Sequence, residues 1–161
     1  MPQNKEKTCC FTGHRQIPSA QLEAIARRTL DAIVSLYKEG YRHFITGGAL
    51  GFDTLCARIV LQLKAAYPDM TLTLVLPCRD QDALWQESDR LTFAQQKSRA
   101  DEVVCLSEKY TASCMRTRNQ YMVDQSSAII AYLTHSNSGA GQTVRMAQKQ
   151  GLRIIMTQDE P

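Results

Sequence analysis

The sequence has no long apolar run. Nowhere in its 161 residues is there a stretch approaching the about 20 apolar residues that cross a membrane as a helix. The first residues, MPQNKEKTCCF, are polar and lack the apolar segment of a secretory signal peptide. We therefore expect a cytoplasmic protein that makes no contact with a membrane.

The six cysteines include no Cys-x-x-Cys pair, the spacing typical of a structural zinc site, so we expect no bound metal. In the cytoplasm their side chains stay reduced. Cys9, Cys10 and Cys105 fall in short apolar runs that resemble strands. We expect these three to be buried thiols without a chemical role.

Charge of one sign is not gathered anywhere along the chain. Lysine and arginine number 19 against 16 aspartates and glutamates, which gives a net charge of +3, and the two signs are mostly interleaved. Proteins that bind nucleic acids usually carry a clustered basic face that neutralises phosphates. We therefore expect a solvated surface and no nucleic-acid partner.

Short apolar runs alternate with amphipathic stretches from one end of the chain to the other, without repeats or a long linker. The pattern predicts strands over residues 8–12, 43–46, 71–76, 102–106, 128–133 and 152–156. It predicts helices over residues 20–39, 52–63, 81–100, 114–125 and 141–150. Ser19 and Gly40 are placed to cap the two ends of the first helix.

Strands that alternate with helices form parallel units with helices on both faces of the sheet. We therefore expect the α/β class: a single Rossmann-like three-layer domain with a mostly parallel sheet. It spans residues 1–161, with its core at about 8–156. Such sheets bind ligands at the carboxyl ends of their strands, so the residues after each strand are the candidates for a site.

The first turn contains Thr12, Gly13, His14 and Arg15. Glycine lets the backbone turn sharply and approach a ligand, while threonine offers a hydroxyl and arginine a fork that matches phosphate. The alternative is a plain turn with a surface arginine and a hydrogen-bonded histidine. Both interpretations remain open at this point.

The second turn opens directly into a helix and contains Gly47, Gly48, Ala49, Gly51 and Asp53. Glycines allow close approach, and the start of a helix presents free N–H groups to an anion. The pattern is not G-x-G-x-x-G, it lacks the lysine of a P-loop, and glycines also serve ordinary tight turns. For Asp53 two interpretations stay open: it contacts a ribose hydroxyl of the ligand, or it stabilises the first turn of the helix through the helix dipole.

The predicted helix over residues 114–125 carries polar side chains within its apolar stripe. Met115, Met122 and Val123 define the stripe, and Arg118 and Asn119 lie inside it. An inward guanidinium needs a partner, because burying an unpaired charge is costly. We expect Arg118 to bind a phosphate or a ribose. The alternative is an internal salt bridge or a cap on a strand end.

The turn after the fifth predicted strand also opens a helix. It contains Ser138, Gly139, Gly141 and Thr143 and supplies a second anion site at a helix start. Two glycine-rich turns of this kind in one sheet predict a ligand that spans both, such as a nucleotide with its sugar and phosphate.

Four motifs in order resemble a known family: FTGHR, TGGALGFD, MRTRNQYMVDQS and NSGAGQTVRMA. They look like the YpsA-like branch of the SLOG superfamily, over about Thr8 to Ile155. The resemblance implies a Rossmann-like sheet, related to the LOG-type cytokinin-activating enzymes and to the DprA core. It implies ligands such as AMP, ADP-ribose or NAD, and a homodimer would fit the superfamily. The ligand residues it implies are Gly13, Gly47, Gly48, Arg118, Gly139, Gly141 and Thr143.

The match to the LOG-type enzymes is partial. Their M-x-x-R-K ends here in Asn119, and their P-G-G-x-G-T-x-x-E, aligned on Thr143, places Met146 where the catalytic glutamate belongs. We therefore expect non-catalytic binding or sensing of a nucleotide-derived ligand, with no cofactor required. The alternative is hydrolysis of an N-glycosidic bond in a nucleotide or NAD-like substrate, with Asp53 as the candidate catalytic carboxylate. A third hypothesis, a DNA-associated protein by analogy with DprA, is disfavoured by the modest net charge.

Overall fold

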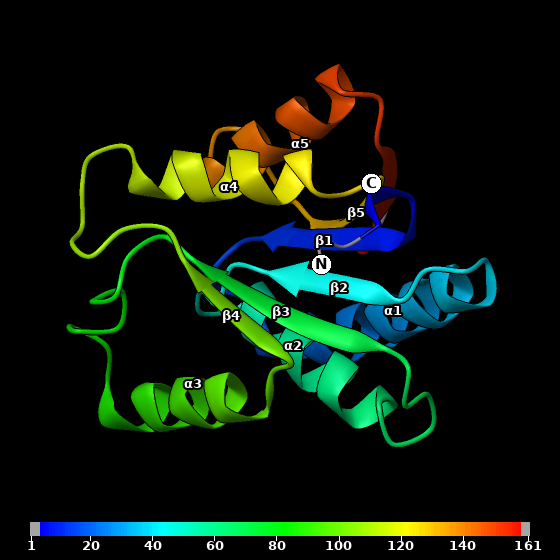
Figure 1. Cartoon of the computed structure of the whole chain (residues 1–161), viewed down its shortest axis with the longest axis horizontal. Coiled ribbons are helices and arrows are strands. Elements are labelled where there is room, and N and C mark those ends of the chain that lie inside the picture. Colours follow the sequence, from blue (N-terminus) through cyan, green and yellow to red (C-terminus); the bar gives the residue numbers. More distant parts are fainter. Residues whose placement is uncertain (1–3, 159–161) are drawn as a thin grey trace.

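A six-stranded sheet, parallel throughout, forms the middle layer of the structure (Figure 1). This computed structural model describes residues 4–158. The strand order is β4-β3-β2-β1-β5-β6. The strands are β1 (Thr8–Gly13), β2 (His43–Thr46), β3 (Thr71–Leu76), β4 (Glu102–Cys105), β5 (Ala128–Tyr132) and β6 (Arg153–Met156).

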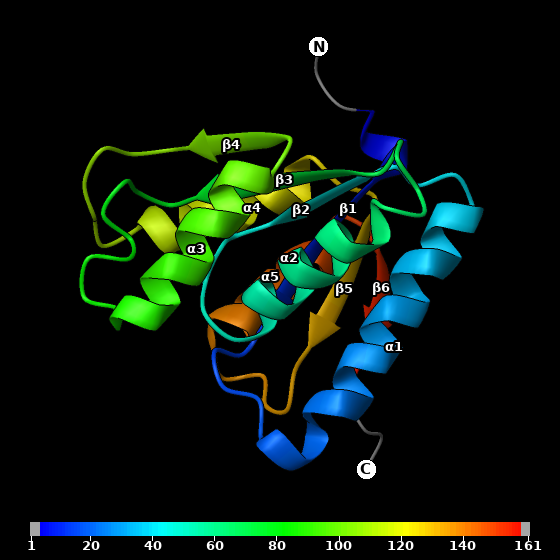
Figure 2. The same cartoon turned by 90° about the horizontal axis from the view of Figure 1, so that it is seen from below.

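Helices cover both faces of the sheet, as the sequence predicts. The helices are α1 (Ser19–Lys38), α2 (Phe52–Leu63), α3 (Glu87–Arg99), α4 (Cys114–Asp124) and α5 (Gly139–Lys149). Figure 2 shows α1, α2 and α3 in front of one face, and Figure 1 shows α4 and α5 on the other. A short 3-10 turn, η1 (Lys5–Lys7), precedes β1. No helix within residues 4–158 is long and apolar enough to cross a membrane.

The strand β1 lies at the centre because both of its faces are apolar. Side chains alternate between the two faces of a strand. Phe11 packs into the core under α1 and α2, whereas Cys10 packs into the core under α4 and α5. A strand buried on both faces needs this continuous apolar pattern. Cys9 and Cys10 are fully buried, as expected.

The order in which successive strands are added to the sheet changes direction at β1. It runs from β1 outward to β4, then returns to place β5 on the free side of β1. Gly13 of β1 pairs with Tyr132 of β5, so the two strands end together. Open α/β sheets bind their ligands in the crevice at such a point. The candidate turns after β1 and β5 therefore lie at the favoured place in this fold.

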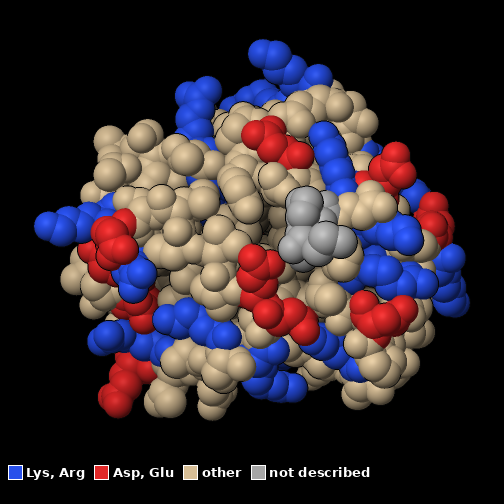
Figure 3. Space-filling model, in the orientation of Figure 1, with Lys and Arg blue, Asp and Glu red and all other residues tan. Residues whose placement is uncertain are grey.

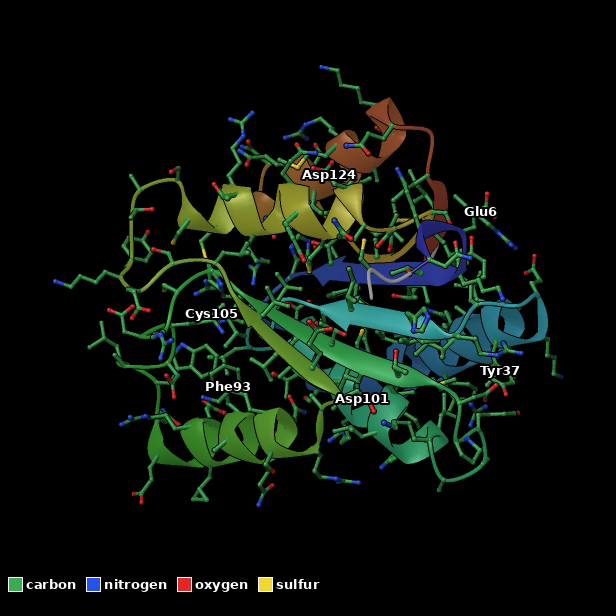
Figure 4. All side chains as sticks on the ribbon, viewed as in Figure 1. Glu6, Tyr37, Phe93, Asp101, Cys105 and Asp124 are labelled. Carbon is green, nitrogen blue, oxygen red and sulfur yellow. The ribbon has the colours of Figure 1, made fainter. Side chains whose placement is uncertain are left out.

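Three local predictions need correction. Ser19 does not cap α1, because it is already the first helical residue and its side chain makes no capping hydrogen bond. The third helix begins at Glu87 rather than at residue 81. The segment before it is held in turns, since Gln81 donates to the carbonyl of Gly48 and Trp85 packs on Phe93 at 5.1 Å between ring centroids. Figure 4 shows Phe93 between α3 and the sheet.

The third correction concerns Cys105, which is exposed rather than buried. It ends β4, which lies at the edge of the six described strands and pairs there with β3 (Figure 4). Its Sγ donates to the carbonyl of Ser107. An apolar run predicts a strand, but the run alone does not reveal that the strand lies at an edge. By contrast, Gly40 ends α1 as predicted, with a φ of 109° just after the capping residue Glu39.

Candidate functional site

A cavity of about 370 Å³ lies at the carboxyl end of β1, on the side of α4 and α5. The turn after β1, the start of α2, the inner face of α4 and the start of α5 form its walls. Figure 1 shows the arrowheads of β1 and β2 pointing to this edge. The lining residues are Thr12, Gly13, His14, Arg15, Ala49, Asp53, Met115, Arg118, Asn119, Met122, Ser138, Gly139 and Ala140.

Most of the predicted site residues line this one cavity. Residues from four separate motifs meet there, from Thr12 after β1 to Gly139 at the start of α5. Sequence reasoning missed Met115, Met122 and Ala140 as lining residues. The two methionines had a usable signal, because they share their helical stripe with Arg118.

Arg118 is 5% exposed and is tied to the protein. Its Nη1 donates to the carbonyl of Gly47 at 2.6 Å and its Nε donates to Oδ1 of Asn119 at 2.7 Å. Gly47 directly follows β2, so the strand-end cap left open above is present. Burial lowers the pKa of Arg118 and the nearby Asp53 opposes this shift, but arginine stays charged in proteins. The cavity wall therefore carries a fixed positive charge.

Asp53 is 6% exposed and lies in the first turn of α2. Its Oδ2 accepts from the backbone N–H of Ala49 at 3.2 Å. Its Oδ1 is buried and has no hydrogen-bond partner among residues 4–158. Burial raises the pKa of this carboxyl, and the charge of Arg118 acts in the opposite direction. The side chain of Thr46 also lowers this pKa as a hydrogen-bonding neighbour, and Oδ1 is closed off from solvent, so Asp53 belongs to the structure of the cavity wall. Its first-turn position also fits the alternative of helix stabilisation.

His14, which follows β1, links the ends of β1 and β5 through a hydrogen bond to the turn after β5. Its Nε2 accepts from the backbone N–H of Thr134 at 2.9 Å, which leaves the ring proton on Nδ1. The ring stacks on His135 with 4.3 Å between centroids. Burial, and then His135, lower the pKa of His14. The predicted alternative of a hydrogen-bonded histidine therefore holds for Nε2, although the side chain also lines the cavity.

The start of α5 provides backbone donors. Ser138 caps the helix, accepting from the N–H of Gly141 at 3.0 Å, and the first turn contains no acidic residue. At Gly139, the first helical residue, a Cβ would meet no atom within 4 Å. A free helix start of this kind favours anions through its N–H groups and its dipole. Within residues 4–158, no three His, Cys, Asp or Glu side chains gather as a metal site.

Two glycines outside the cavity lining hold its walls in place. A Cβ on Gly47 would lie 2.2 Å from Nη1 of Arg118. Gly51 has a positive φ of 81°, and a Cβ there would lie 2.2 Å from the carbonyl oxygen of Arg15. These contacts are within the protein, so both glycines have a packing reason that the prediction of an anion site did not include.

The other predicted residues outside the lining are Gly48, Gly141 and Thr143. Gly48 is buried and its carbonyl accepts from Gln81. A Cβ on Gly141 would lie 2.0 Å from the carbonyl oxygen of Ser136, and the hydroxyl of Thr143 donates to the carbonyl of Gly139. Gly48 thus belongs to the turn between β2 and α2, and Gly141 and Thr143 to the first turns of α5, and none of the three lines the cavity.

Met146 does not face the cavity either. It lies in a separate groove between α4 and α5, with Arg116, Arg145 and Lys149. Asp124 lies beside this groove and joins the two helices by accepting from Gln120 and Gln150 (Figure 4). The position that the LOG-type motif would give to a catalytic glutamate is therefore outside the cavity.

Solved structures of low sequence identity share the fold. DprA from Streptococcus pneumoniae superposes with a TM-score of 0.67 at 16% identity, over 94% of this chain and 50% of that chain. DprA from Helicobacter pylori has a TM-score of 0.67 at 19% identity, over 94% and 65%. The chain thus spans about half to two thirds of each DprA. The protein TM1055 has a TM-score of 0.55 at 13% identity.

Relatives by sequence place the chain in a family. The prophage-derived protein YoqJ of Bacillus subtilis is 31% identical over 124 residues, which are 70% of this chain and 72% of YoqJ. A UPF0398 protein of Bacillus cereus is 25% identical over 133 residues, covering 81% and 72%. The model of the YspA SLOG family matches residues 10–154, and the chain therefore belongs to that family.

Proposed function

We propose that this protein binds a nucleotide-derived ligand in the cavity at the end of β1 and does not catalyse its conversion. The observation that carries the proposal is the meeting of the buried charge of Arg118 with the free start of α5 in the walls of one cavity, which Asp53 also lines. Nucleotides combine hydroxyl donors on the sugar with an anionic phosphate, and the cavity offers a group for each.

The roles follow from charge and hydrogen bonding. The phosphate is held by the N–H groups at the start of α5 and by the charges of Arg118 and Arg15, because helix starts and guanidinium groups favour phosphate. The ribose lies beside Asp53, which lines the same cavity. Met115 and Met122 supply the apolar part of the wall. The cavity volume of about 370 Å³ falls in the range of about 300–1,000 Å³ common for small-molecule sites.

A second candidate is an N-glycosidic hydrolase, and it is favoured by one observation. Asp53 is a carboxylate in the cavity wall, and a carboxylate stabilises the oxocarbenium-like state of glycosidic cleavage. We rank it second because the position of the LOG-type glutamate is taken by Met146, outside the cavity.

A nucleic-acid strand is a weaker candidate ligand. The DprA from Helicobacter pylori binds single-stranded DNA, but its likeness to this chain is one of fold. Figure 3 shows acidic and basic side chains interleaved over the face it presents, in keeping with a net charge of +3. Strand binding needs a basic stripe along the backbone, so we expect a small nucleotide instead.

The test measures thermal stability and isothermal titration heats with AMP, ADP-ribose, NAD and a dT oligonucleotide. A ligand at about 100 times its Kd adds roughly 2.7 kcal/mol, which raises the Tm by roughly 5–10 °C in a domain of this size. Unchanged melting with every nucleotide in the panel would contradict the proposal. Stabilisation by the oligonucleotide alone would replace it with strand binding.

A matched pair of variants locates the ligand. Gly139→Val adds a side chain where a Cβ meets open space in the cavity wall, so the fold is kept while room for the ligand is lost. Gln142→Val adds the same side chain to the same helix, but outside the cavity. We expect at least a tenfold loss of AMP affinity in the first variant and none in the second. Equal affinities would place the ligand elsewhere.

A further inference from the structure

The groove between α4 and α5 gathers basic side chains. Its volume is about 390 Å³. Arg116 of α4 and Arg145 and Lys149 of α5 bring three positive charges to its lining, and none of the described residues that line it is acidic. Figure 3 shows basic side chains along the upper edge of the molecule, where Figure 1 places these two helices. The groove shares no lining residue with the cavity at the end of β1, so the two are separate spaces.

The three cations of the groove repel one another. Arg145 and Lys149 are four residues apart on α5, so they lie one above the other on the same face of the helix. Like charges at this spacing destabilise a helix. Arg116 adds a third positive charge from α4, and no acid in the described lining offsets it. An anion between the two helices would relieve this repulsion.

The donors of the groove are available to a ligand. Arg116 and Lys149 are exposed and make no hydrogen bond or ion pair with any residue from 4 to 158. Arg145 is held in place, because its Nη1 donates to the carbonyl of Ser136 at 3.0 Å. A guanidinium has five N–H donors, so this bond leaves others for an anion. The groove thus combines one positioned arginine with two cations that have no partner among the described residues.

Asp124 is an acid beside the groove, but it lies at one end of it. It is the last residue of α4, and its Oδ1 accepts from Nε2 of Gln120 and of Gln150 (Figure 4). Arg116 lies eight residues earlier on α4, which is about 12 Å along a helix axis. This separation exceeds the screening length of about 8 Å at physiological ionic strength. Asp124 therefore has little effect on the charge of the groove at Arg116.

We propose that the groove between α4 and α5 is an anion site, separate from the nucleotide cavity, and that it binds two or more linked phosphate groups, as in pyrophosphate. Arginine and lysine are the side chains that bind phosphates, the first as a planar fork and the second as a point charge. A single phosphate carries about 1.5–2 negative charges at neutral pH, so it balances only part of the three positive charges, whereas two linked phosphates balance all three. The exposed amide of Gln142 adds a neutral donor to the lining.

The experiment measures the binding of pyrophosphate and of inorganic phosphate to Gly139→Val by isothermal titration. This variant has the nucleotide cavity blocked and the groove intact. We expect pyrophosphate to bind at least tenfold more tightly than phosphate. No binding of pyrophosphate to Gly139→Val would overturn the inference, and so would equal affinity for the two anions, because one phosphate would then suffice. ADP, added to the same protein, distinguishes the sources of the diphosphate: both results keep the site, and a lower affinity for ADP assigns it to the free anion.

Variants of the groove locate the anion. Arg116→Ala combined with Lys149→Ala removes two charges without breaking a hydrogen bond or ion pair to residues 4–158, so the Tm stays unchanged. We expect this pair to weaken pyrophosphate binding by Gly139→Val at least tenfold. Arg99→Ala combined with Lys38→Ala removes the same charges from exposed positions on α3 and α1 and is the matched control. An equal loss in both pairs would show a general charge effect and would refute the site.

Two further results separate this inference from the proposed function. AMP binding should be the same in the parent and in the parent carrying Arg116→Ala with Lys149→Ala. Failure of AMP to bind at all would contradict the proposed function and leave the anion site standing. A loss of AMP affinity as large as that of pyrophosphate would make the groove part of the nucleotide site and would overturn the inference. Binding of a dT oligonucleotide that depends on Arg116 and Lys149, without binding of pyrophosphate, would overturn it in favour of a strand.

Discussion

Replacing Gly47 with alanine tests how the cavity wall is built. The new Cβ would lie 2.2 Å from Nη1 and 2.5 Å from Cζ of Arg118, far inside contact distance. Gly47 is not among the glycines with positive φ, so alanine fits the backbone and the effect comes from this contact alone. The buried guanidinium must move, and its 2.6 Å hydrogen bond to the carbonyl of residue 47 is lost.

The size of the effect follows from that hydrogen bond. Hydrogen bonds to charged groups contribute about 1.5–3 kcal/mol, and displacing Nε from Asn119 adds to this. We expect Gly47→Ala to lower the free energy of unfolding by about 2–4 kcal/mol, or the Tm by roughly 4–16 °C. Urea denaturation measures the change. Gly139→Ala is the control, because its Cβ meets no atom within 4 Å and its stability should match the parent.

A double-mutant cycle decides whether Arg118 is the cause. In an Arg118→Ala background the obstructing guanidinium is absent, so Gly47→Ala should cost less than about 0.5 kcal/mol, as for an uncoupled site. An equal cost in both backgrounds would refute the reasoning, as would a Gly47→Ala protein as stable as the parent. The first result would mean that the cost comes from the backbone turn, and the second that Arg118 moves aside without loss of stability.

Three further predictions follow from the site. Because burial raises the pKa of Asp53 above 3.8, the folded chain holds this proton more tightly than the unfolded chain, so stability is lost as the pH rises through that range. Urea denaturation of Asp53→Asn from about pH 4 to pH 7 should show a flatter profile than the parent. Because burial and then His135 lower the pKa of His14 below 6.5, stability falls as the pH drops below 6.5. His14→Gln should lose part of that slope in the same assay, and an unchanged slope would contradict it. Met146→Glu should gain no release of adenine from AMP by chromatography, because the new carboxylate lies in the groove between α4 and α5.

The order of elements and the place of the site could be predicted from the sequence because both depend on local patterns. Apolar runs of four to six residues, such as those that form β2 and β3, are long enough to mark strands. Parallel connection then brings the turns after Gly13 and Tyr132 to one edge of the sheet. Cavity residues from β1, α4 and α5 thus follow from topology, before any contact is known.

The roles of the glycines could not be predicted in this way. A glycine in a turn indicates that a side chain there would clash with a neighbouring group, but it does not identify that group. At Gly47 the neighbouring group is the side chain of Arg118, 71 residues further along the chain, and at Gly141 it is the carbonyl of Ser136. The exposure of Cys105 escaped prediction for a similar reason, since it depends on which strand lies outermost. Contacts between distant segments decide these points.

The distinction between holding a nucleotide and cleaving it depends on how many carboxyl groups the cavity offers. Most glycosidases place two on opposite sides of the bond, one to protonate the leaving group and one to stabilise or attack the sugar. Among residues 4–158 the cavity is lined by one, Asp53, and its Oδ2 already accepts from the N–H of Ala49. A single carboxyl cannot both protonate the leaving group and stabilise or attack the sugar at the same time. Among the described residues the cavity thus lacks the second carboxyl of most glycosidases, which agrees with our proposal that the ligand is bound and not cleaved.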